Sequence, residues 1–368
     1  MFNTSVYEKT SRVFSSNVRL SKRFLVAILS AICIAVIYIA LLSPSSRGWE
    51  SQCTDNRWTT TNPAEMEAAF LVPSQFTFLN LNTLNATTHP KERREHILIL
   101  TPLKNASPYL GRHFELLDRL SYPKELISIA FLVSDTTDDT VQMLKEYADI
   151  FLNRPNHADR FHRIQVFEKD FHYELPEDKR HTYALQPLRR SVMARSRNYL
   201  LNTALNEEHS WVLWLDVDIV DYPETVLEDL MSVNVDVVVP NCLLKREDGQ
   251  FWGYDKNNWQ ETEESLALQK DLDPDFVFLE GYWEFVTHRL LLIDMPTHLG
   301  KFAKFPLDGV GGTFTLVKAQ VHREGANFPA YPFQHQMETE GFAKMAKAMG
   351  FGVYGLPGYM VYHTTNSS

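Results

Sequence analysis

Asp216 and Asp218 are the residues of this chain whose types and spacing point most directly to chemistry. They stand two residues apart at the end of the apolar run 211–215. Two neighbouring carboxylates offer hard oxygen ligands, which suit Mn²⁺ or Mg²⁺ held together with substrate phosphates. An arbitrary Asp-x-Asp is more often a solvated turn. The interpretation therefore depends on the elements that position the pair.

The run before Asp216 is apolar without alternation, which predicts a strand buried on both faces. Similar runs alternate along the chain with segments of helical spacing, among them a helix over 188–206 with Leu188, Val192 and Leu200 facing inward. This alternation predicts an α/β fold with a mostly parallel central sheet. Ligands of such sheets bind beyond the carboxyl ends of the strands, where Asp216 and Asp218 would lie. Strands are expected over 96–102, 126–133, 164–167, 211–215 and 235–240, with further helices over 111–120 and 140–152.

Residues 24–42 are apolar almost throughout and about as long as a helix needs to cross a bilayer. Basic residues precede this segment, so the positive-inside rule predicts a cytoplasmic tail over 1–23 and a lumenal remainder. A cleaved signal peptide is the alternative, although its apolar core would be shorter. We expect a signal-anchor at 24–42, a lumenal stem over 43–94 that carries a glycosylation sequon at Asn85, and one large domain over 95–368.

The chain carries a formal net charge of −10. Its basic tail makes the remainder still more acidic, and this argues against nucleic-acid binding. Four arginines nevertheless stand close together ahead of the Asp-x-Asp strand: Arg189, Arg190, Arg195 and Arg197. They are either a solvated helix face or, for one or two of them, a guanidinium clamp on a diphosphate.

A second zone rich in aromatic and polar residues follows the strand at 235–240. Aromatic faces cover the apolar side of a pyranose and amides bind its hydroxyls, so the segment 251–261 is a candidate for sugar recognition. The alternative is a loop held to the core by Trp252 and Trp259. The candidates in this segment are Tyr254, Asp255, Asn258 and Trp259.

Three further segments hold candidate residues. Asp308 opens a glycine-rich stretch, 308–312, where a ligand or another chain segment must approach closely. Glu340 lies at an acidic helix start, for which compensation of the helix dipole is the simplest account. His363 ends the last apolar stretch and is a possible third metal ligand, although an isolated histidine is more often an ordinary packed residue.

These segments together resemble the fungal Golgi α-mannosyltransferases of the mannan-polymerase family, glycosyltransferase family 62. The resemblance covers about residues 95–363. It rests on HILILTPLKNASPYL, FLVSDTTDDT, ARSRNYLL, WVLWLDVDIV, GYDKNNWQE, LDGVGG, NFPAYPFQHQMETEGFAKMAK and YMVYH.

The resemblance implies a GT-A nucleotide-sugar fold, GDP-mannose as donor and Mn²⁺ as cofactor. It places Asp216 and Asp218 in the family's metal-and-diphosphate motif, and His363 where the family has a further metal ligand. Arg189 matches the family's functional arginine. Positions around the nucleotide match Thr101, Pro102, Asp135 and, within the arginine cluster, Arg197. Asp308 and Glu340 lie in family motifs without an assigned role.

The implied activity is transfer of mannose, with retention, to α-mannoside chains of N-glycans in fungal mannan synthesis. The enzyme would be a type II Golgi membrane protein in a hetero-complex with other mannosyltransferase subunits. We expect front-face attack by the acceptor hydroxyl, since no residue is identifiable as a carboxylate nucleophile. A non-catalytic scaffold subunit is the main alternative. A metal-dependent phosphohydrolase and a carbohydrate-binding module are weaker ones.

Overall fold

A computed structural model describes residues 78–84 and 86–365 of this chain. The expected cytoplasmic tail, the apolar segment 24–42, most of the stem and Asn85 lie outside these ranges. In the described ranges, no helix has both the length and the apolar character needed to span a bilayer. The compact unit that carries the candidate residues begins at Asn80.

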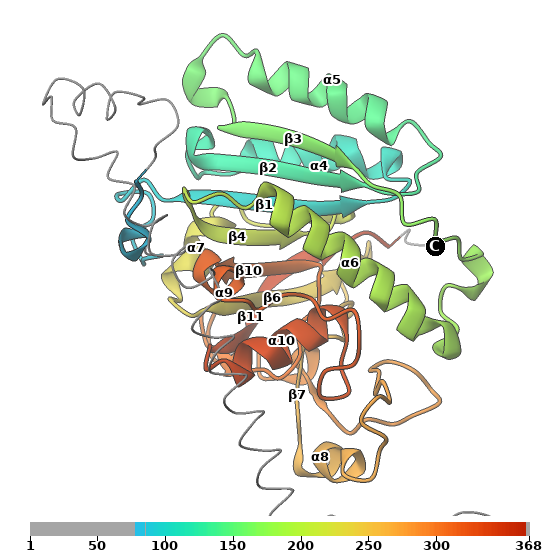
Figure 1. The fold of residues 1–368 in the computed structure, drawn as a ribbon. Coiled ribbons are helices and arrows are strands. Elements are labelled where there is room, and N and C mark those ends of the chain that lie inside the picture. The colour runs from blue at the N-terminus through green and yellow to red at the C-terminus, as the bar shows by residue number, and fades with distance from the viewer. Residues whose placement is uncertain (1–77, 85, 366–368) are drawn as a thin grey trace, which may run out of the picture. The chain divides into compact units, whose positions relative to one another are not determined.

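A nine-stranded sheet forms the centre of this unit, with strand order β3-β2-β1-β4-β10-β6-β11-β5 and β9 paired to β11 (Figure 1). β1 to β4, β6 and β11 run in one direction, while β5, β9 and β10 run in the other. A separate hairpin pairs β7 with β8. The fold is therefore a mixed α/β fold with a mostly parallel central sheet, as the alternation of elements predicted. The strands are β1 (His96–Leu103), β2 (Ile127–Val133), β3 (Arg163–Glu168), β4 (His209–Leu215), β5 (Ile219–Asp221), β6 (Val237–Leu244), β7 (Trp259–Gln260), β8 (Leu290–Leu291), β9 (Phe305–Pro306), β10 (Phe314–Lys318) and β11 (Val353–His363).

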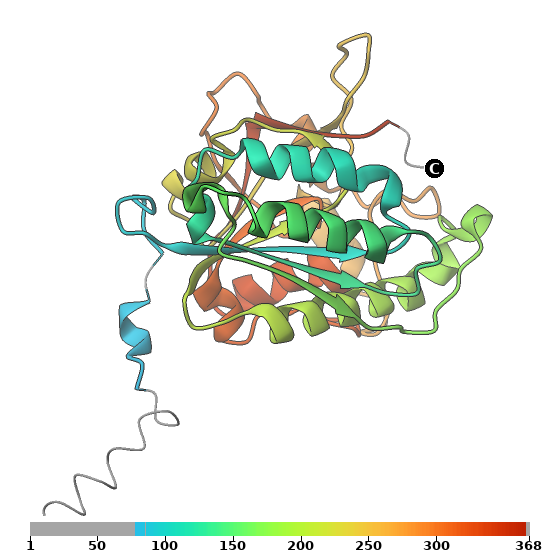
Figure 2. The same ribbon diagram turned by 90° about the horizontal axis from the view of Figure 1, so that it is seen from above.

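Helices cover both faces of the sheet, as the view in Figure 2 shows. α4, α5 and α7 bury their apolar residues in one hydrophobic cluster, and α6, α9 and α10 bury theirs in another on the opposite face. Burial on both faces explains why the central strands are apolar without alternation. The α-helices are α4 (Ser107–Arg119), α5 (Thr140–Leu152), α6 (Gln186–Ala204), α7 (Val226–Ser232), α8 (Glu263–Gln269), α9 (Ala319–Arg323) and α10 (Glu338–Ala348). Short 3-10 helices span Leu81–Thr83, Lys124–Leu126, His157–Asp159, Glu177–Lys179, Tyr183–Leu185 and Leu292–Asp294.

Two details of the sequence prediction were wrong. Leu188 is 59% exposed, because Ala194, Leu200 and Leu201 form the buried face of α6 instead. The first strand extends one residue beyond the expected end at Pro102, because β1 pairs with β2 as far as Leu103. The pairing of β1 with β4 stops at Leu100, so the strand edge is unpaired on that side where Pro102 lies, which is where proline is tolerated.

Candidate active site

The sheet brings Asp216, Asp218 and His363 together at one edge. Asp216 follows β4, His363 ends β11, and the two strands run in the same direction. β5 begins directly after Asp218 and pairs with the end of β11, with His363 opposite Ile219. The imidazole Nε2 of His363 consequently lies 3.0 Å from Oδ2 of Asp218. Residues 145 positions apart in the sequence thus form one cluster.

The ring of His363 is held in a defined orientation. Its Nδ1 lies 2.8 Å from the backbone carbonyl of Thr364, which only accepts hydrogen bonds, so Nδ1 carries the hydrogen and Nε2 is left to face Asp218. The ring of Tyr254 stacks on it, with centroids 3.7 Å apart. Burial alone would lower the pKa of His363, but the hydrogen bond and charge of Asp218 outweigh burial and raise it.

This donor set fits a divalent cation. The imidazole of His363 meets the carboxylate of Asp218, and Asp216 stands two residues earlier, directly after β4. The hydrogen bond from Nδ1 to a backbone carbonyl is the usual way in which a ligating histidine is oriented. Oδ1 of Asp218 is buried and has no hydrogen-bond partner in the described part of the chain. Leaving such an oxygen unpaired is costly, and a cation would satisfy it. Asp216, Asp218 and His363 are therefore the residues that would hold the metal.

Arg197 is the arginine of α6 that reaches the carboxylate pair. Its Nη2 lies 3.5 Å from Oδ1 of Asp216, and its Nε donates to Glu338 at 2.8 Å. Burial alone would lower the pKa of Arg197, but Glu338 and Asp216 raise it. Desolvation raises the pKa of Asp216, and the Arg197 charge opposes this rise. Arg197 thus favours the ionised form of Asp216 that a metal ligand requires.

Glu338 is a site residue that the sequence interpretation missed. It starts α10 with a left-handed backbone, φ 51°, and it is almost fully buried. Compensation of the helix dipole had seemed sufficient for this acidic start, but the carboxylate forms an ion pair with Arg197 of α6. The available signal in the sequence was that α10 begins with acidic residues while α6 carries several arginines.

The other arginines of α6 have separate partners. Arg190 forms a buried ion pair with Glu340, whose carboxylate also accepts a hydrogen bond from the Trp259 indole at 3.2 Å. Arg189, expected to act on the donor, is partly buried and donates to Gln186 of its own helix. Arg195 lies exposed over the Phe171 ring. The structure thus brings Arg197, rather than Arg189, into contact with the Asp-x-Asp pair.

The aromatic segment divides into a part near the cluster and a part in the core. Tyr254 stacks on His363, and the neighbouring Asp255 accepts a hydrogen bond from Thr313 at 2.6 Å. Trp259 is fully buried beneath the Arg289 guanidinium, 3.6 Å from the ring centroid, and offers no face to a sugar. It holds its loop to the core, as the alternative interpretation had it, whereas Trp252 is exposed.

Two more candidates of this zone form internal contacts. Asn258 is buried and accepts a hydrogen bond from the backbone of Gly311 at 2.8 Å. Asp308 accepts hydrogen bonds from the backbone of Glu261 and from Lys347. The glycine-rich stretch allows another chain segment to approach, because a Cβ at Gly309 would come within 2.3 Å of the Trp259 ring.

The residues expected around the nucleotide lie near the ends of β1 and β2. Thr101 is fully buried within β1, beside Pro102. Asp135 follows β2 with a left-handed backbone, φ 46°, and its carboxylate accepts hydrogen bonds from the backbone of Phe171 and His172. A cavity of about 370 Å³ adjoins the Asp-x-Asp segment. It is lined by Pro108, Tyr109, Arg112, Val217, Val220 and Thr364.

Comparison with known proteins agrees with the motifs. A family model described as Anp1 matches residues 75–332. The chain belongs to the Anp1 family. It is 44% identical over 275 residues to the mannan polymerase II complex anp1 subunit of Schizosaccharomyces pombe, a match that spans 73% of this chain and 64% of the relative. The resemblance to the fungal mannan-polymerase family is thereby confirmed.

Other relatives carry related names. The mannan polymerase complex subunit MNN9 of Candida albicans is 41% identical over 297 residues, 77% of this chain and 78% of the relative. The ANP1 subunit of Saccharomyces cerevisiae is 38% identical, and the match spans 78% of this chain but only 58% of that relative. Among solved structures, a mannosyltransferase of Pyrobaculum calidifontis in complex with GDP-Man and Mn²⁺ has a TM-score of 0.41 at 11% identity, covering 74% of this chain and 57% of the other. This structural similarity is too low to indicate an activity.

Proposed function

We propose that this chain is a metal-dependent α-mannosyltransferase that takes mannose from GDP-mannose. The observation that carries the proposal is the cluster of Asp216, Asp218 and His363 at the carboxyl edge of the sheet. Membership of the Anp1 family supports the mannan chemistry, since relatives are named as mannan polymerase subunits. The acceptors would be α-mannoside chains of N-glycans in the fungal cell wall, joined through α-1,6 or α-1,2 linkages.

The residues of the cluster have distinct tasks in this proposal. Asp216, Asp218 and His363 hold a divalent cation, Mn²⁺ or Mg²⁺, which offsets the charge of the departing diphosphate when bound. Arg197 keeps Asp216 ionised and in place. The acceptor hydroxyl attacks the anomeric carbon from the face that GDP leaves, so the glycosidic bond forms, the bond to GDP breaks, and the proton goes to the diphosphate. Trapping a covalent mannosyl-enzyme would contradict this front-face course.

We place the enzyme in the Golgi membrane as a type II protein, with residues 24–42 as anchor and the domain in the lumen. The apolar segment and the basic residues before it support this topology. The names of the relatives support a hetero-complex with other mannosyltransferase subunits. The same names also favour a second candidate, a subunit that assembles partner enzymes without catalysing transfer itself.

One experiment distinguishes the two candidates. The purified complex is incubated with GDP-mannose, Mn²⁺ and short α-1,6-mannosides, and the products are quantified and their linkages determined. Asp216→Asn with Asp218→Asn should lower the transfer attributable to this subunit by about 10³-fold, the loss expected when transition-state electrostatics are removed. Asp248→Asn is the matched control, since Asp248 pairs with Arg246 on an exposed loop. An assembled complex with unchanged rate and linkages would leave only the scaffold role.

A further inference from the structure

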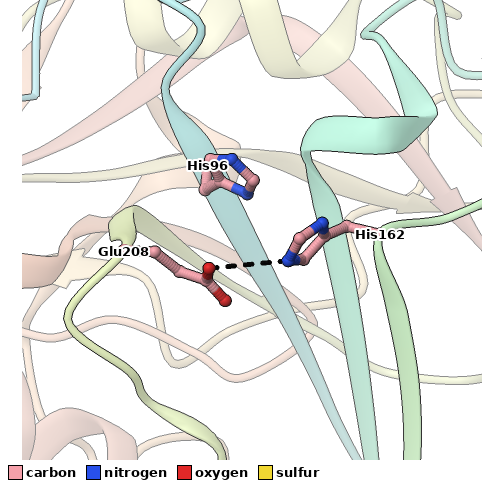
Figure 3. Close-up of side chains that lie close together, drawn as sticks. All are labelled: His96, His162 and Glu208. Carbon is pink, nitrogen blue, oxygen red and sulfur yellow. Dashed lines mark ion pairs between the residues drawn. The ribbon is translucent and has the colours of Figure 1, made fainter. Parts of the chain in front are cut away.

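A second cluster of metal-ligating side chains lies at the opposite edge of the sheet from Asp216. His96 is the first residue of β1, Glu208 comes directly before β4, and His162 comes directly before β3. These strands are parallel to one another, so their first residues meet at the amino edge. Figure 3 shows the three side chains directed into one common space.

The separations within the cluster are close to those of a metal site. One ligand atom from each residue lies within 4.8 Å of the others. Nε2 of His162 lies 3.5 Å from the Glu208 carboxylate. Two ligands at about 2.1 Å from a tetrahedral ion are about 3.4 Å apart. That pair therefore already has the spacing of two ligands, and a ligand atom of His96 lies within 4.8 Å of both.

Two atoms of the cluster lack hydrogen bonds. Nδ1 of His96 and Oε1 of Glu208 are buried, and neither has a hydrogen-bond partner within the described ranges. A zinc-type ion accepts both kinds of ligand atom, imidazole nitrogen and carboxylate oxygen.

A fourth residue, His209, lies beside the carboxylate without a hydrogen bond to it. It is fully buried, and its Nδ1 accepts a hydrogen bond from the backbone of Asn206 at 3.0 Å. The hydrogen of the neutral ring is therefore on Nε2, which faces Oε1 of Glu208 at 3.7 Å.

An ordinary surface ion pair explains less of this geometry. Arg163 lies 3.5 Å from Glu208 and is partly exposed, so it can neutralise the carboxylate. It does not account for the buried Nδ1 of His96, which has no hydrogen-bond partner among the described residues. Neutral imidazoles that converge on a carboxylate are the donor set of zinc-type ions rather than of Mg²⁺ or Ca²⁺.

We propose that His96, His162 and Glu208 bind a divalent transition-metal ion of the zinc type, with an exchangeable position left open to solvent. The ion would join the starting points of β1, β3 and β4. This site is independent of the proposed transferase activity, because its ligands lie at the other edge of the sheet.

The test uses the full chain carrying Asp216→Asn and Asp218→Asn, which removes the carboxylates of the first cluster. Co²⁺ serves as the probe, because its visible absorption reports a tetrahedral site, and Zn²⁺ serves as the competitor. One Co²⁺ per chain should bind and be displaced by Zn²⁺. Adding Glu208→Gln or His162→Gln should weaken binding at least tenfold. Adding His157→Gln, at an exposed histidine of the preceding 3-10 helix, should change nothing.

X-ray absorption of the Zn²⁺-loaded chain guards against variants that fail to fold, because it needs no further substitution. Two imidazole nitrogens at about 2.0 Å are expected. The proposal is overturned by the absence of stoichiometric Co²⁺ binding, by equal affinities in the Gln variants and the His157 control, or by a zinc environment without imidazole.

Discussion

The two edges of the central sheet differ in the atoms that they present. The carboxyl edge collects Asp216, Asp218 and a single imidazole, whereas the amino edge collects imidazoles around the single carboxylate of Glu208. Both sets adjoin β4, one directly after it and one directly before it. Oxygen-rich sites favour Mn²⁺ and Mg²⁺, and imidazole-rich sites favour zinc-type ions. The two proposed metal sites would therefore differ in the cation that they favour.

The histidines at the two edges also respond to their surroundings in opposite directions. Desolvation lowers the pKa of His209 to about 3, and no carboxylate contact offsets it fully. The pKa of His363 is raised, because Asp218 outweighs the same desolvation. The charges around the two imidazoles differ. Asp218 lies 3.0 Å from His363, whereas His209 is surrounded by positive groups, which lower its pKa further: His96, Arg323, Arg163 and His162.

The largest expected effect comes from breaking the buried ion pair between Arg197 and Glu338, which lies at the carboxyl edge and not at the amino edge. Arg197→Ala leaves Glu338 buried without its partner, and removing one member of such a pair costs about 3–5 kcal/mol of the free energy of unfolding. Urea denaturation measures this loss. Arg195→Ala on the same helix is the control, since Arg195 is exposed and lies over the Phe171 ring.

The same two variants also test whether the two edges of the sheet are independent of each other. Arg197→Ala should reduce mannose transfer strongly at temperatures where the protein remains folded, while Zn²⁺ binding at the amino edge should keep its affinity. A loss of stability below 1 kcal/mol, equal to that of the Arg195 control, would show that Glu338 finds another partner and that the pair does not support Asp216.

The second prediction uses the opposite pKa shifts. His209 has a folded pKa of about 3, below its unfolded value of about 6.5, so its neutral burial stabilises the fold fully above pH 6.5. That contribution is lost as the pH falls from 6.5 towards 3, with a slope of at most about 1.4 kcal/mol per pH unit. His209→Asn should therefore flatten the decline of the unfolding free energy between pH 6.5 and 4, measured with a chelator present.

His363 should behave in reverse. Its folded pKa is raised, so its contribution is fully present below the unfolded pKa and is lost as the pH rises through the folded one. The stability deficit of His363→Asn relative to the unsubstituted chain should shrink as the pH rises above about 6.5. Parallel pH profiles for both histidine variants would refute the assigned difference between the edges.

Much of the architecture could be predicted from local sequence. The runs that became β1, β2, β4 and β6 are apolar on both faces because helices cover both faces, and this pattern is visible in single segments. The position of β10 in the sheet could not be predicted from the sequence. It pairs antiparallel with β4 over five residues and with β6 over two, and these pairs join residues between 78 and 107 positions apart.

The motifs named three candidate ligands that the fold brings to one edge, but they did not reveal the supporting contacts. Asp216, Asp218 and His363 were named from motifs, and the sheet brings them to one edge. The ion pairs of α6 with α10 join residues 141 and 150 positions apart, and no local pattern assigns each arginine its acid. Aromatic composition likewise could not distinguish buried Trp259 from exposed Trp252, because burial is decided by the loop's path over the core.

The smallest expected effect is that of Thr101→Val, which tests whether the proposed nucleotide site extends into β1. Thr101 was expected near the nucleotide, but its Oγ1 is buried in β1 and has no hydrogen-bond partner among the residues described. Thr101→Val keeps the shape and removes the unpaired hydroxyl, so the unfolding free energy should stay equal or rise by about 1 kcal/mol, with an unchanged KM for GDP-mannose.

Thr315→Val is the matched control. The Thr315 hydroxyl donates to the Gly311 carbonyl at 2.7 Å, and its removal should cost about 1 kcal/mol. If Thr101→Val raised KM while Thr315→Val did not, the Thr101 hydroxyl would belong to the nucleotide site, and the carboxyl edge would extend into β1.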